Sequence, residues 1–391
     1  MSQYFDERAA SQIAVIYTDF SKAFYKVNHN ILLEKLDSVG YSEDLLNLFK
    51  SYLSGREQYI SFKGKTFSLY DCPSGIPRGS NVGPYLFLLY TAEVQKDLVN
   101  SRCLLYADDL KLFRVIRGNE DRELLQHDLN KLAEWSSKNK LPLNIKKCYK
   151  MTFTRSLQPI DTAYSIGEET FESHEKMRDL GVVVQGDLKF GEQLQSISMK
   201  AKRNLGAIMR YSKHFSNSGT IRALYFTLVR SHLDFGSVVW SSLGRERSNN
   251  LEKNQKRALK YLYFKDFGYY EHEITYRELV SGYELSTMKE RRDSTLLLFI
   301  RDLLNSKIES PPLLQIIMLN APPRTHRRRN STFYVPLCRT AQFQTAPLHQ
   351  AQALYNKIEE IDTTIDIFFD SRATFQNKIR NALRELHCEP V

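Results

Sequence analysis

Two apolar segments that contain aspartates constrain the fold of this chain more than any other feature of its sequence. Residues 14–20 (AVIYTDF) are apolar and β-branched up to Asp19, and residues 103–113 (CLLYADDLKLF) place two short apolar arms around Asp108 and Asp109. Runs of this length and composition are typical of strands. We therefore predict a buried strand with Asp19 at its tip and a hairpin with Asp108 and Asp109 at its turn.

The rest of the first half predicts helices and further strands. Ser42 is the expected N-cap of a helix with acids in its first turn, where negative charge interacts favourably with the helix dipole. In chain order we expect a helix around 31–36, a helix over 42–54, a hairpin of 58–62 and 66–70, a helix over 81–99, an amphipathic helix over 119–138 and a strand over 148–154. From residue 190 onward the pattern is predominantly helical.

Three acids at two strand tips form the arrangement that two-metal phosphoryl transfer requires. In that chemistry two Mg²⁺ ions about 3.5–4 Å apart activate the attacking oxygen and stabilise the leaving one, and bridging carboxylates hold them. Asp19 and Asp108 would be the bridging pair, with Asp109 beside them. Each signal alone has a simpler interpretation, because an aspartate at a strand end or in a turn is usually a solvated turn residue.

The net charge of +10 lies entirely in the second half of the chain. Residues 1–185 hold 24 Lys and Arg and 24 Asp and Glu, whereas residues 186–391 hold 31 and 21. A neutral body followed by a basic region fits a catalytic part with an appended polyanion-binding arm. A general contribution to solubility is the alternative interpretation.

The helical stretch 196–215 leaves the same choice open. Its apolar face would contain Ala201, Leu205 and Ile208, and its opposite face is cationic. The cationic residues are Lys200, Arg203 and Arg210. This face would contact a phosphate backbone or form the solvated side of a surface helix. The proline-punctuated, arginine-rich segment 322–330 predicts an exposed linker or arm.

The cysteines and the hydropathy pattern exclude several classes of protein. The five cysteines lie far apart with no CxxC pair, so neither a zinc site nor a disulfide framework is indicated. There is no run of about eighteen apolar residues and no charged-then-apolar N-terminal segment, so neither a membrane span nor a secretory signal is indicated. We expect a cytoplasmic or nuclear protein. The sequence gives no basis for an oligomeric state.

Six segments extend the pattern beyond the acids. They are TDFSKAF (18–24), SYLSGREQ (51–58), SGIPRGSNVGPYLFLLY (74–90), YADDLKLF (106–113), LPLNIKKC (141–148) and DLGV (179–182). In this order and spacing they resemble the palm motifs of reverse transcriptases from jockey-like non-LTR retrotransposons. The resemblance is strong over about 15–185, looser through 228–240 and 251–262, and faint beyond.

The resemblance implies catalytic roles for Asp19, Asp108, Asp109 and Lys147. The aspartates would bind two Mg²⁺ ions, and Lys147 would neutralise or protonate the departing pyrophosphate. Phe24 would close the sugar pocket against a 2′-hydroxyl, so the enzyme would prefer dNTPs. A solvated strand-end lysine and an ordinary core phenylalanine are the alternatives at the last two positions.

Further positions are implied to bind nucleotide, template and primer. The small residues of the 74–80 loop permit close backbone approach, and the DLGV segment resembles the primer-grip hairpin. The implied nucleotide-binding residues are Phe20, Phe24, Arg78 and Gly79. The implied template- and primer-binding residues are Gly75, Pro77, Ser80, Leu180, Gly181, Lys200, Arg203 and Arg210. The partners would be an RNA template, a DNA primer or RNA–DNA hybrid, and dNTPs.

The chain departs from the family pattern in three respects. Tyr25 stands where the family usually has aspartate, and Arg78 stands where it usually has glutamine. Arginine adds a charge and offers no acceptor. The chain also begins only eighteen residues before Asp19, where the family has a fingers region with cationic contacts to the triphosphate. These departures are typical of a decaying copy, and we expect little or no polymerase activity.

We therefore predict an α+β protein with a right-hand polymerase palm, an antiparallel sheet with packed helices that lacks most of the fingers. A helical thumb and a basic, mostly helical C-terminal region would follow. The predicted domains are 1–185 (palm with primer-grip hairpin), 186–270 (helical, thumb-like) and 271–391 (basic C-terminal region). The predicted function is RNA-directed DNA polymerase activity of a non-LTR retrotransposon, impaired in this chain. A catalytically inactive nucleic-acid-binding remnant and an unstable product that no cell uses are the alternatives.

Overall fold

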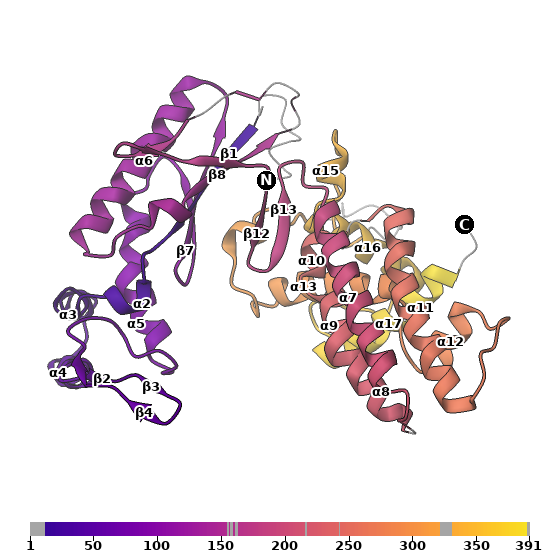
Figure 1. Cartoon of the computed structure of the whole chain (residues 1–391). Coiled ribbons are helices and arrows are strands. Elements are labelled where there is room, and N and C mark those ends of the chain that lie inside the picture. The colour runs from indigo at the N-terminus through magenta and orange to yellow at the C-terminus, as the bar shows by residue number, and fades with distance from the viewer. Residues whose placement is uncertain are drawn as a thin grey trace. The chain divides into compact units, whose positions relative to one another are not determined.

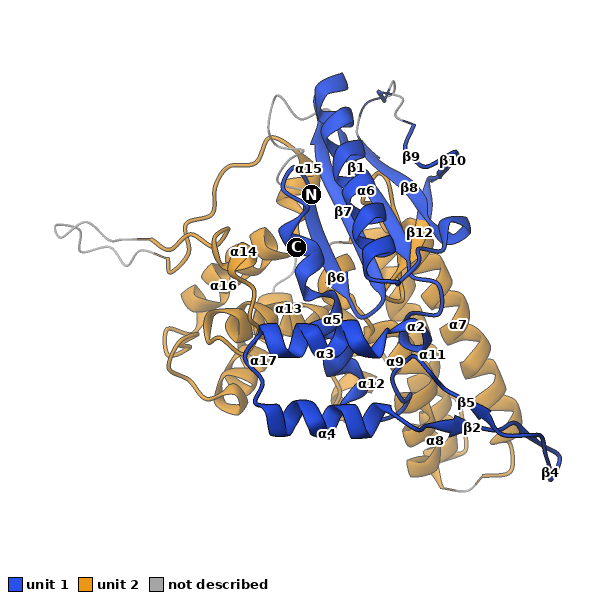
Figure 2. Ribbon diagram, turned by 90° about the vertical axis from the view of Figure 1, so that its left-hand side faces the viewer, with its two compact units in different colours: residues 1, 3–176 blue, residues 2, 177–391 orange. Residues whose placement is uncertain are grey.

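The chain forms two compact units, residues 3–176 and residues 177–391, shown in Figure 1 and Figure 2. The computed structural model describes residues 12–154, 156, 159–160, 163–215, 217–241, 243–320 and 331–388. The arginine-rich arm predicted at 322–330 lies outside the described residues.

A five-stranded sheet with the order β11, β8, β1, β7, β6 forms the centre of the first unit (Figure 1). The strands are β1 (Gln12–Asp19), β6 (Arg102–Tyr106), β7 (Asp109–Ile116), β8 (Tyr149–Thr154) and β11 (Glu172–His174). The central strand β1 pairs antiparallel with β7 and β8, whereas β11 pairs with β8 in parallel. Residues 13–16 are at most 1% exposed, which confirms the buried strand predicted from the apolar run.

Helices pack against this sheet through one shared core (Figure 2). The helices of the first unit are α2 (Ala23–Lys26), α3 (His29–Ser38), α4 (Glu43–Leu53), α5 (Gly83–Thr91) and α6 (Asn119–Lys138), with the 3₁₀ turns η1 (Ala92–Lys96) and η2 (Ile145–Lys147). Ala14 and Ile16 of β1 lie in the same core as Leu86 of α5 and Leu129 of α6. They share one face of the strand because side chains alternate along it. The predicted combination of a largely antiparallel sheet with packed helices is confirmed.

The hairpin predicted after α4 forms a ribbon of two short ladders. β2 (Glu57–Gln58) pairs with β5 (Tyr70–Asp71), and β3 (Ser61–Phe62) pairs with β4 (Lys65–Thr66). Six large apolar side chains of this ribbon are 50–63% exposed. They are Tyr59, Ile60, Phe62, Phe67, Leu69 and Tyr70. A narrow ribbon with exposed apolar side chains and open edges favours association between molecules.

The second unit is almost entirely helical (Figure 1). It begins with a hairpin of β12 (Lys176–Asp179) and β13 (Val182–Gln185). The predicted first domain ends at 185, after this hairpin, whereas the boundary between the compact units lies at its first strand. The helical elements are α7 (Gly191–Tyr211), α8 (Ser218–Tyr225), the π-helical turn η3 (Phe226–Arg230), α9 (Ser231–Asp234), α10 (Ser237–Trp240), α11 (Arg245–Phe267), α12 (Tyr276–Gly282), α13 (Met288–Leu304), α14 (Pro311–Leu314), α15 (Ala341–Gln344), α16 (Pro347–Ile361) and α17 (Arg372–Cys388).

Two hydrophobic cores lie within the second unit, and α13 joins them. Met288 at the start of α13 packs in a core with α7 and α11, whereas Leu296 and Ile300 further along α13 pack with α16 and α17. The boundary between the two cores thus lies within α13, whereas the sequence predicts a domain boundary at residue 270. Within the described ranges, none of the helices combines the length and the apolar character that a membrane span requires.

Replacing two ribbon phenylalanines, Phe62→Ser with Phe67→Ser, is expected to raise the soluble fraction of expressed protein without lowering its melting temperature. Both side chains are at least 60% exposed, so their removal takes apolar surface from water contact and leaves the core intact. Val99→Ser is the control, because Val99 is 78% exposed and lies outside the ribbon. The soluble fraction and static light scattering are the measurements. An equal gain from the control would contradict a role for the ribbon.

Candidate active site

The strand pairing brings the ends of β1 and β7 together. Asp19, the last residue of β1, is the direct partner of Asp109, the first residue of β7. Directly opposed residues of an antiparallel pair have side chains on the same face, with Cβ atoms about 4.5–5.5 Å apart. The Asp19 side chain is 23% exposed, and Asp109 is exposed. Two of the three predicted acids therefore lie next to each other at one end of the sheet.

A two-residue turn carries the third acid. The β6–β7 ladder closes with the pair Tyr106 and Asp109, so Ala107 and Asp108 form the loop. Ala107 has a φ of 52°, the positive value that two-residue hairpin loops need and that costs a non-glycine residue about 1–2 kcal/mol. Asp108 is half-buried in this turn. The sequence placed both acids at the tip, and the structure puts Asp108 in the loop and Asp109 in the strand.

Lys147 lies beside Asp19. Its Nζ is 3.1 Å from Asp19 Oδ2, and its side chain is 67% exposed. The backbone holds this arrangement, because the Asn144 N–H donates to the Asp19 carbonyl oxygen at 2.7 Å and the Ser21 N–H donates to the Pro142 carbonyl oxygen at 2.8 Å. The segment that precedes Lys147 is thus fastened to the end of β1.

Carboxylate oxygens are the ligands that Mg²⁺ prefers, so the three aspartates suit this ion in their chemistry. Among the residues that the structure describes, no three His, Cys, Asp or Glu side chains are grouped closely enough to hold a metal ion. Asp19 and Asp109 are nevertheless adjacent in the sheet, and Asp108 precedes Asp109 in the chain. The acids are thus of the residue type that binds magnesium, and Lys147 contacts one of them.

The 74–80 loop packs directly on the segment that follows Asp19. The Gly75 N–H donates to the Val27 carbonyl oxygen at 2.8 Å, and the Ile76 N–H donates to the Phe24 carbonyl oxygen at 2.7 Å. A Cβ added at Gly75, where φ is +85°, would lie 2.7–2.8 Å from backbone atoms of Phe24 and Tyr25. Only glycine fits here, because both the backbone conformation and the space exclude a side chain.

Two residues without a role in the sequence analysis hold this loop in place. The His29 Nε2–H donates to the Gly75 carbonyl oxygen at 2.8 Å. Arg56 Nη2 donates to the same oxygen at 2.5 Å and to the Ser74 carbonyl oxygen at 3.2 Å. Arg56 belongs to the SYLSGREQ segment. The sequence identifies this motif but does not indicate that Arg56 holds the loop. No pattern in the sequence distinguished His29.

The two predicted phenylalanines have different environments. The Phe24 ring is half-buried and stacks on Phe87 with ring centroids 4.7 Å apart. The Phe20 side chain is only 2% exposed and packs against Trp135. The side chain of Phe20 is part of the core, and the prediction that Phe20 binds nucleotide therefore concerns its backbone. Its position after Asp19 explains the burial, because the chain turns inward there and Phe20 bridges to Leu143.

The remaining loop residues form the approach to α5. Ser80 Oγ donates to the Pro77 carbonyl oxygen at 2.9 Å and accepts from the Gly83 N–H at 3.0 Å. The hydroxyl of Ser80 is thus engaged in closing the loop. Gly79 has a φ of +80° and open space around it, and Arg78 beside it is exposed.

Comparison with known proteins identifies this architecture. Residues 3–184 match the family model described as reverse transcriptase (RNA-dependent DNA polymerase). This part of the chain is therefore similar to reverse transcriptases. The RNA-directed DNA polymerase from mobile element jockey of Drosophila funebris is 30% identical over 255 residues, which are 62% of this chain and 28% of that relative. The probable RNA-directed DNA polymerase from transposon BS of Drosophila melanogaster is 24% identical over 274 residues, 66% of this chain and 29% of that relative.

The predicted resemblance to reverse transcriptases of jockey-like non-LTR retrotransposons is confirmed by these relatives. The chain spans under a third of the length of the relatives it matches. Among solved structures, apo telomerase from Candida tropicalis is 13% identical with a TM-score of 0.37, covering 75% of this chain and 50% of that one. That score is too low to support an inference about the fold.

Two residues implied to grip the primer lie outside the unit that holds the acids. Leu180 and Gly181 form the turn between β12 and β13 in the second unit, with φ values of 44° and 89°. Leu180 is 50% exposed. A Cβ at Gly181 would lie 2.9 Å from the Phe235 ring, so glycine is needed for the close approach of the turn to that ring.

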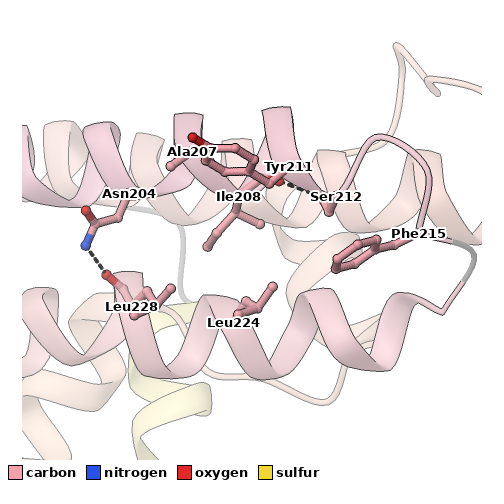
Figure 3. A pocket seen from close by; sticks show the side chains of 8 residues that line it. All are labelled: Asn204, Ala207, Ile208, Tyr211, Ser212, Phe215, Leu224 and Leu228. Atoms are coloured by element: carbon pink, nitrogen blue, oxygen red, sulfur yellow. Dashed lines mark hydrogen bonds between the residues drawn. The ribbon is translucent and has the colours of Figure 1, made fainter.

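The predicted cationic face of α7 is on the surface of the second unit. Arg203 and Arg210 are exposed, and Lys200 is half-buried. The predicted apolar face is confirmed, because Ala201, Leu205 and Ile208 are at most 4% exposed. A cavity of about 230 Å³ lies beside this helix, as Figure 3 shows. Its lining residues are Asn204, Ala207, Ile208, Tyr211, Ser212, Phe215, Leu224 and Leu228.

Gly75→Ala is expected to lower the free energy of unfolding of the first unit by about 2–5 kcal/mol, from left-handed backbone strain together with overpacking. Gly40→Ala is the matched control, because Gly40 has a φ of +91° with nothing within 4 Å, and strain alone should cost about 1–2 kcal/mol. Urea denaturation in a Trp240→Phe background measures both, since Trp135 then reports on the first unit by fluorescence. Equal losses at the two glycines would show that the contact with Tyr25 is unimportant.

Lys147→Met is expected to tighten Mn²⁺ binding up to about fivefold, because an exposed ion pair contributes up to about 1 kcal/mol and the ammonium competes with a metal for Asp19. Electron paramagnetic resonance of free Mn²⁺ measures the affinity. Lys146→Met is the control for charge alone, and Asp19→Asn should weaken the binding. If the two lysine variants bind Mn²⁺ equally, the Lys147–Asp19 contact does not influence the metal.

Proposed function

We propose that this chain is an RNA-directed DNA polymerase that adds dNTPs to the 3′-OH of a primer, with reduced activity in this chain. The observation that carries the proposal is the direct pairing of Asp19 with Asp109 in a region similar to reverse transcriptases, with Asp108 in the adjoining turn. In the reaction, the primer 3′-oxygen forms a bond to the α-phosphorus as the bond to pyrophosphate breaks. The 3′-hydroxyl loses its proton, and pyrophosphate leaves in line.

The three aspartates would hold two Mg²⁺ ions. Bound there, such ions supply neutralisation of the charge that develops on the attacking and leaving oxygens. Lys147, 3.1 Å from Asp19, is the cation nearest to this acid and would neutralise or protonate the departing pyrophosphate. Its 67% exposed side chain leaves it room to turn from Asp19 toward a ligand.

Phe24 and the 74–80 loop would form the pocket for the nucleotide sugar. The Phe24 ring stacks on Phe87, and a ring so placed can reject a 2′-hydroxyl by its position alone. The hydrogen bonds of His29 and Arg56 to Gly75 hold the loop against the Phe24 backbone. The pocket is thus built from a short helix and a loop whose geometry is set before substrate arrives.

The second unit would hold the template and primer strands. Lys200, Arg203 and Arg210 on α7 offer cationic contacts to phosphates, and the turn at Leu180 and Gly181 offers an exposed edge for the growing 3′ end. The expected ligand is an RNA–DNA hybrid, bound through its backbone with little dependence on sequence.

A nucleic-acid-binding protein without catalytic activity is the second candidate. The observation that favours it is the excess of positive charge in residues 186–391, which includes the exposed Arg203 and Arg210. Binding through phosphates needs none of the three acids. The two candidates therefore differ in one respect: a polymerase requires the aspartates for catalysis, whereas a binding protein requires them at most for its fold.

Primer extension on poly(rA)·oligo(dT) with Mg²⁺ and dTTP separates the candidates. Asp108→Ala is expected to lower extension by at least about 10³-fold, a magnitude that charge-stabilising groups commonly supply in phosphoryl transfer, while the affinity for the hybrid stays unchanged. Asp37→Ala is the matched control, an exposed acid of α3 outside the site. Filter binding of the hybrid runs in parallel.

Extension that survives in Asp108→Ala would disprove the catalytic role of the acid. No extension by the unaltered chain, together with tight hybrid binding, would support the second candidate. A fall in hybrid affinity equal to the fall in extension would mean that Asp108 is needed for the fold.

A further inference from the structure

The two side chains at which the active site departs from the family pattern contact each other. The Arg78 guanidinium lies over the Tyr25 ring, with Cζ 4.7 Å from the ring centroid. Tyr25 is 44% exposed and Arg78 is also exposed, so the stack lies on the surface of the first unit.

The backbone fixes the meeting of the two residues. Tyr25 belongs to α2 and Arg78 to the 74–80 loop, and these segments are held together at Gly75. The Ser74 hydroxyl also donates to the Tyr25 carbonyl oxygen at 2.9 Å. The stack is therefore attached to the same backbone contact that positions Phe24, the neighbour of Tyr25.

The geometry of the stack leaves the donors of Arg78 available. The guanidinium carbon of Arg78 lies over the Tyr25 ring, and the five N–H donors of an arginine are directed outward in the plane of its guanidinium. Within the described part of the chain, no carboxylate forms an ion pair with Arg78. An oriented guanidinium with an open edge matches the oxygens of a phosphate group, which it binds through two parallel hydrogen bonds.

The residue at position 25 decides whether this cation is available. An aspartate, which the family pattern has there, would neutralise a nearby arginine by forming an ion pair. A tyrosine holds the arginine by its ring and leaves the positive charge for a ligand. A tyrosine at position 25 thus leaves the charge of Arg78 available to bind an anionic ligand.

We propose that Tyr25 and Arg78 form a single phosphate-binding unit at the nucleotide pocket, in which Arg78 binds phosphate oxygens and Tyr25 is its positioning residue. The proposal rests on the proposed function for its ligand. The phosphates belong to the incoming dNTP or to the bound strand, and both sources present the same chemistry to Arg78.

Equilibrium dialysis with radiolabelled dTTP, and filter binding of poly(rA)·oligo(dT), test the proposal whether or not the chain extends primers. Arg78→Gln is expected to lower the affinity for one of the two phosphate ligands about tenfold to a hundredfold, the range for a charge-assisted hydrogen bond. The affinity for thymidine, which has no phosphate, should stay unchanged. Tyr25→Leu should weaken the same ligand, and Tyr25→Phe should restore it because the ring remains. The double variant Tyr25→Leu with Arg78→Gln should be no weaker than Arg78→Gln alone.

Arg122→Gln and Tyr59→Leu are the matched controls for one charge and one exposed ring outside the site. If Arg78→Gln weakens the binding of dTTP and leaves the binding of the hybrid unchanged, the phosphate belongs to the nucleotide. If it weakens the binding of the hybrid and leaves that of dTTP unchanged, the phosphate belongs to the strand. The proposal is overturned if Arg78→Gln binds both ligands as the unaltered chain does. It is also overturned if Tyr25→Leu binds normally, or if the two single effects add in the double variant. Failed extension with these affinity changes intact would disprove the polymerase and leave the phosphate-binding unit standing.

Discussion

The antiparallel pairing of β1 with β7 is the interaction on which the rest of the first unit depends. Its register runs from Gln12 opposite Ile116 to Asp19 opposite Asp109, so the position of the acids is fixed by every pair along the ladder. A slip of one residue would turn Ala14 and Ile16 away from their core and separate the acids. The register that buries Ala14 and Ile16 is therefore also the register that pairs Asp19 with Asp109. Burial of apolar side chains in the core thus holds the acids at one end of the sheet.

Much of this arrangement could be predicted because it depends on local patterns of apolar and polar residues. The apolar run of β1, the arms around Asp108 and the helical spacing of α6 each specify an element without reference to the rest of the chain. The burial of the Phe20 side chain was not predicted, because a motif gives a residue's position in the chain and not the face to which its side chain points. The roles of His29 and Arg56 depend on a carbonyl oxygen distant in sequence, which local spacing does not reveal.

The second unit was harder to predict for a related reason. Helical patterns show that helices exist, and the partner of each face is decided only by packing. The single helix α13 shows this, because Met288 faces one core and Ile300 faces another, so no break in composition marks the change. The start of this helix is also fixed from a distance, since Glu252 of α11 accepts hydrogen bonds from the Met288 and Lys289 N–H groups at 3.0 and 2.8 Å.

Lys147 gives the aspartates a counter-ion from within the chain. Acids gathered at one sheet end repel each other, and without a neutralising charge this repulsion would oppose the closing of the β1–β7 ladder. The ammonium group 3.1 Å from Asp19 offsets part of that repulsion from within the chain. The fold of the first unit therefore does not depend on a metal to offset this repulsion, and entry of a metal beside Asp19 would be an exchange of one cation for another.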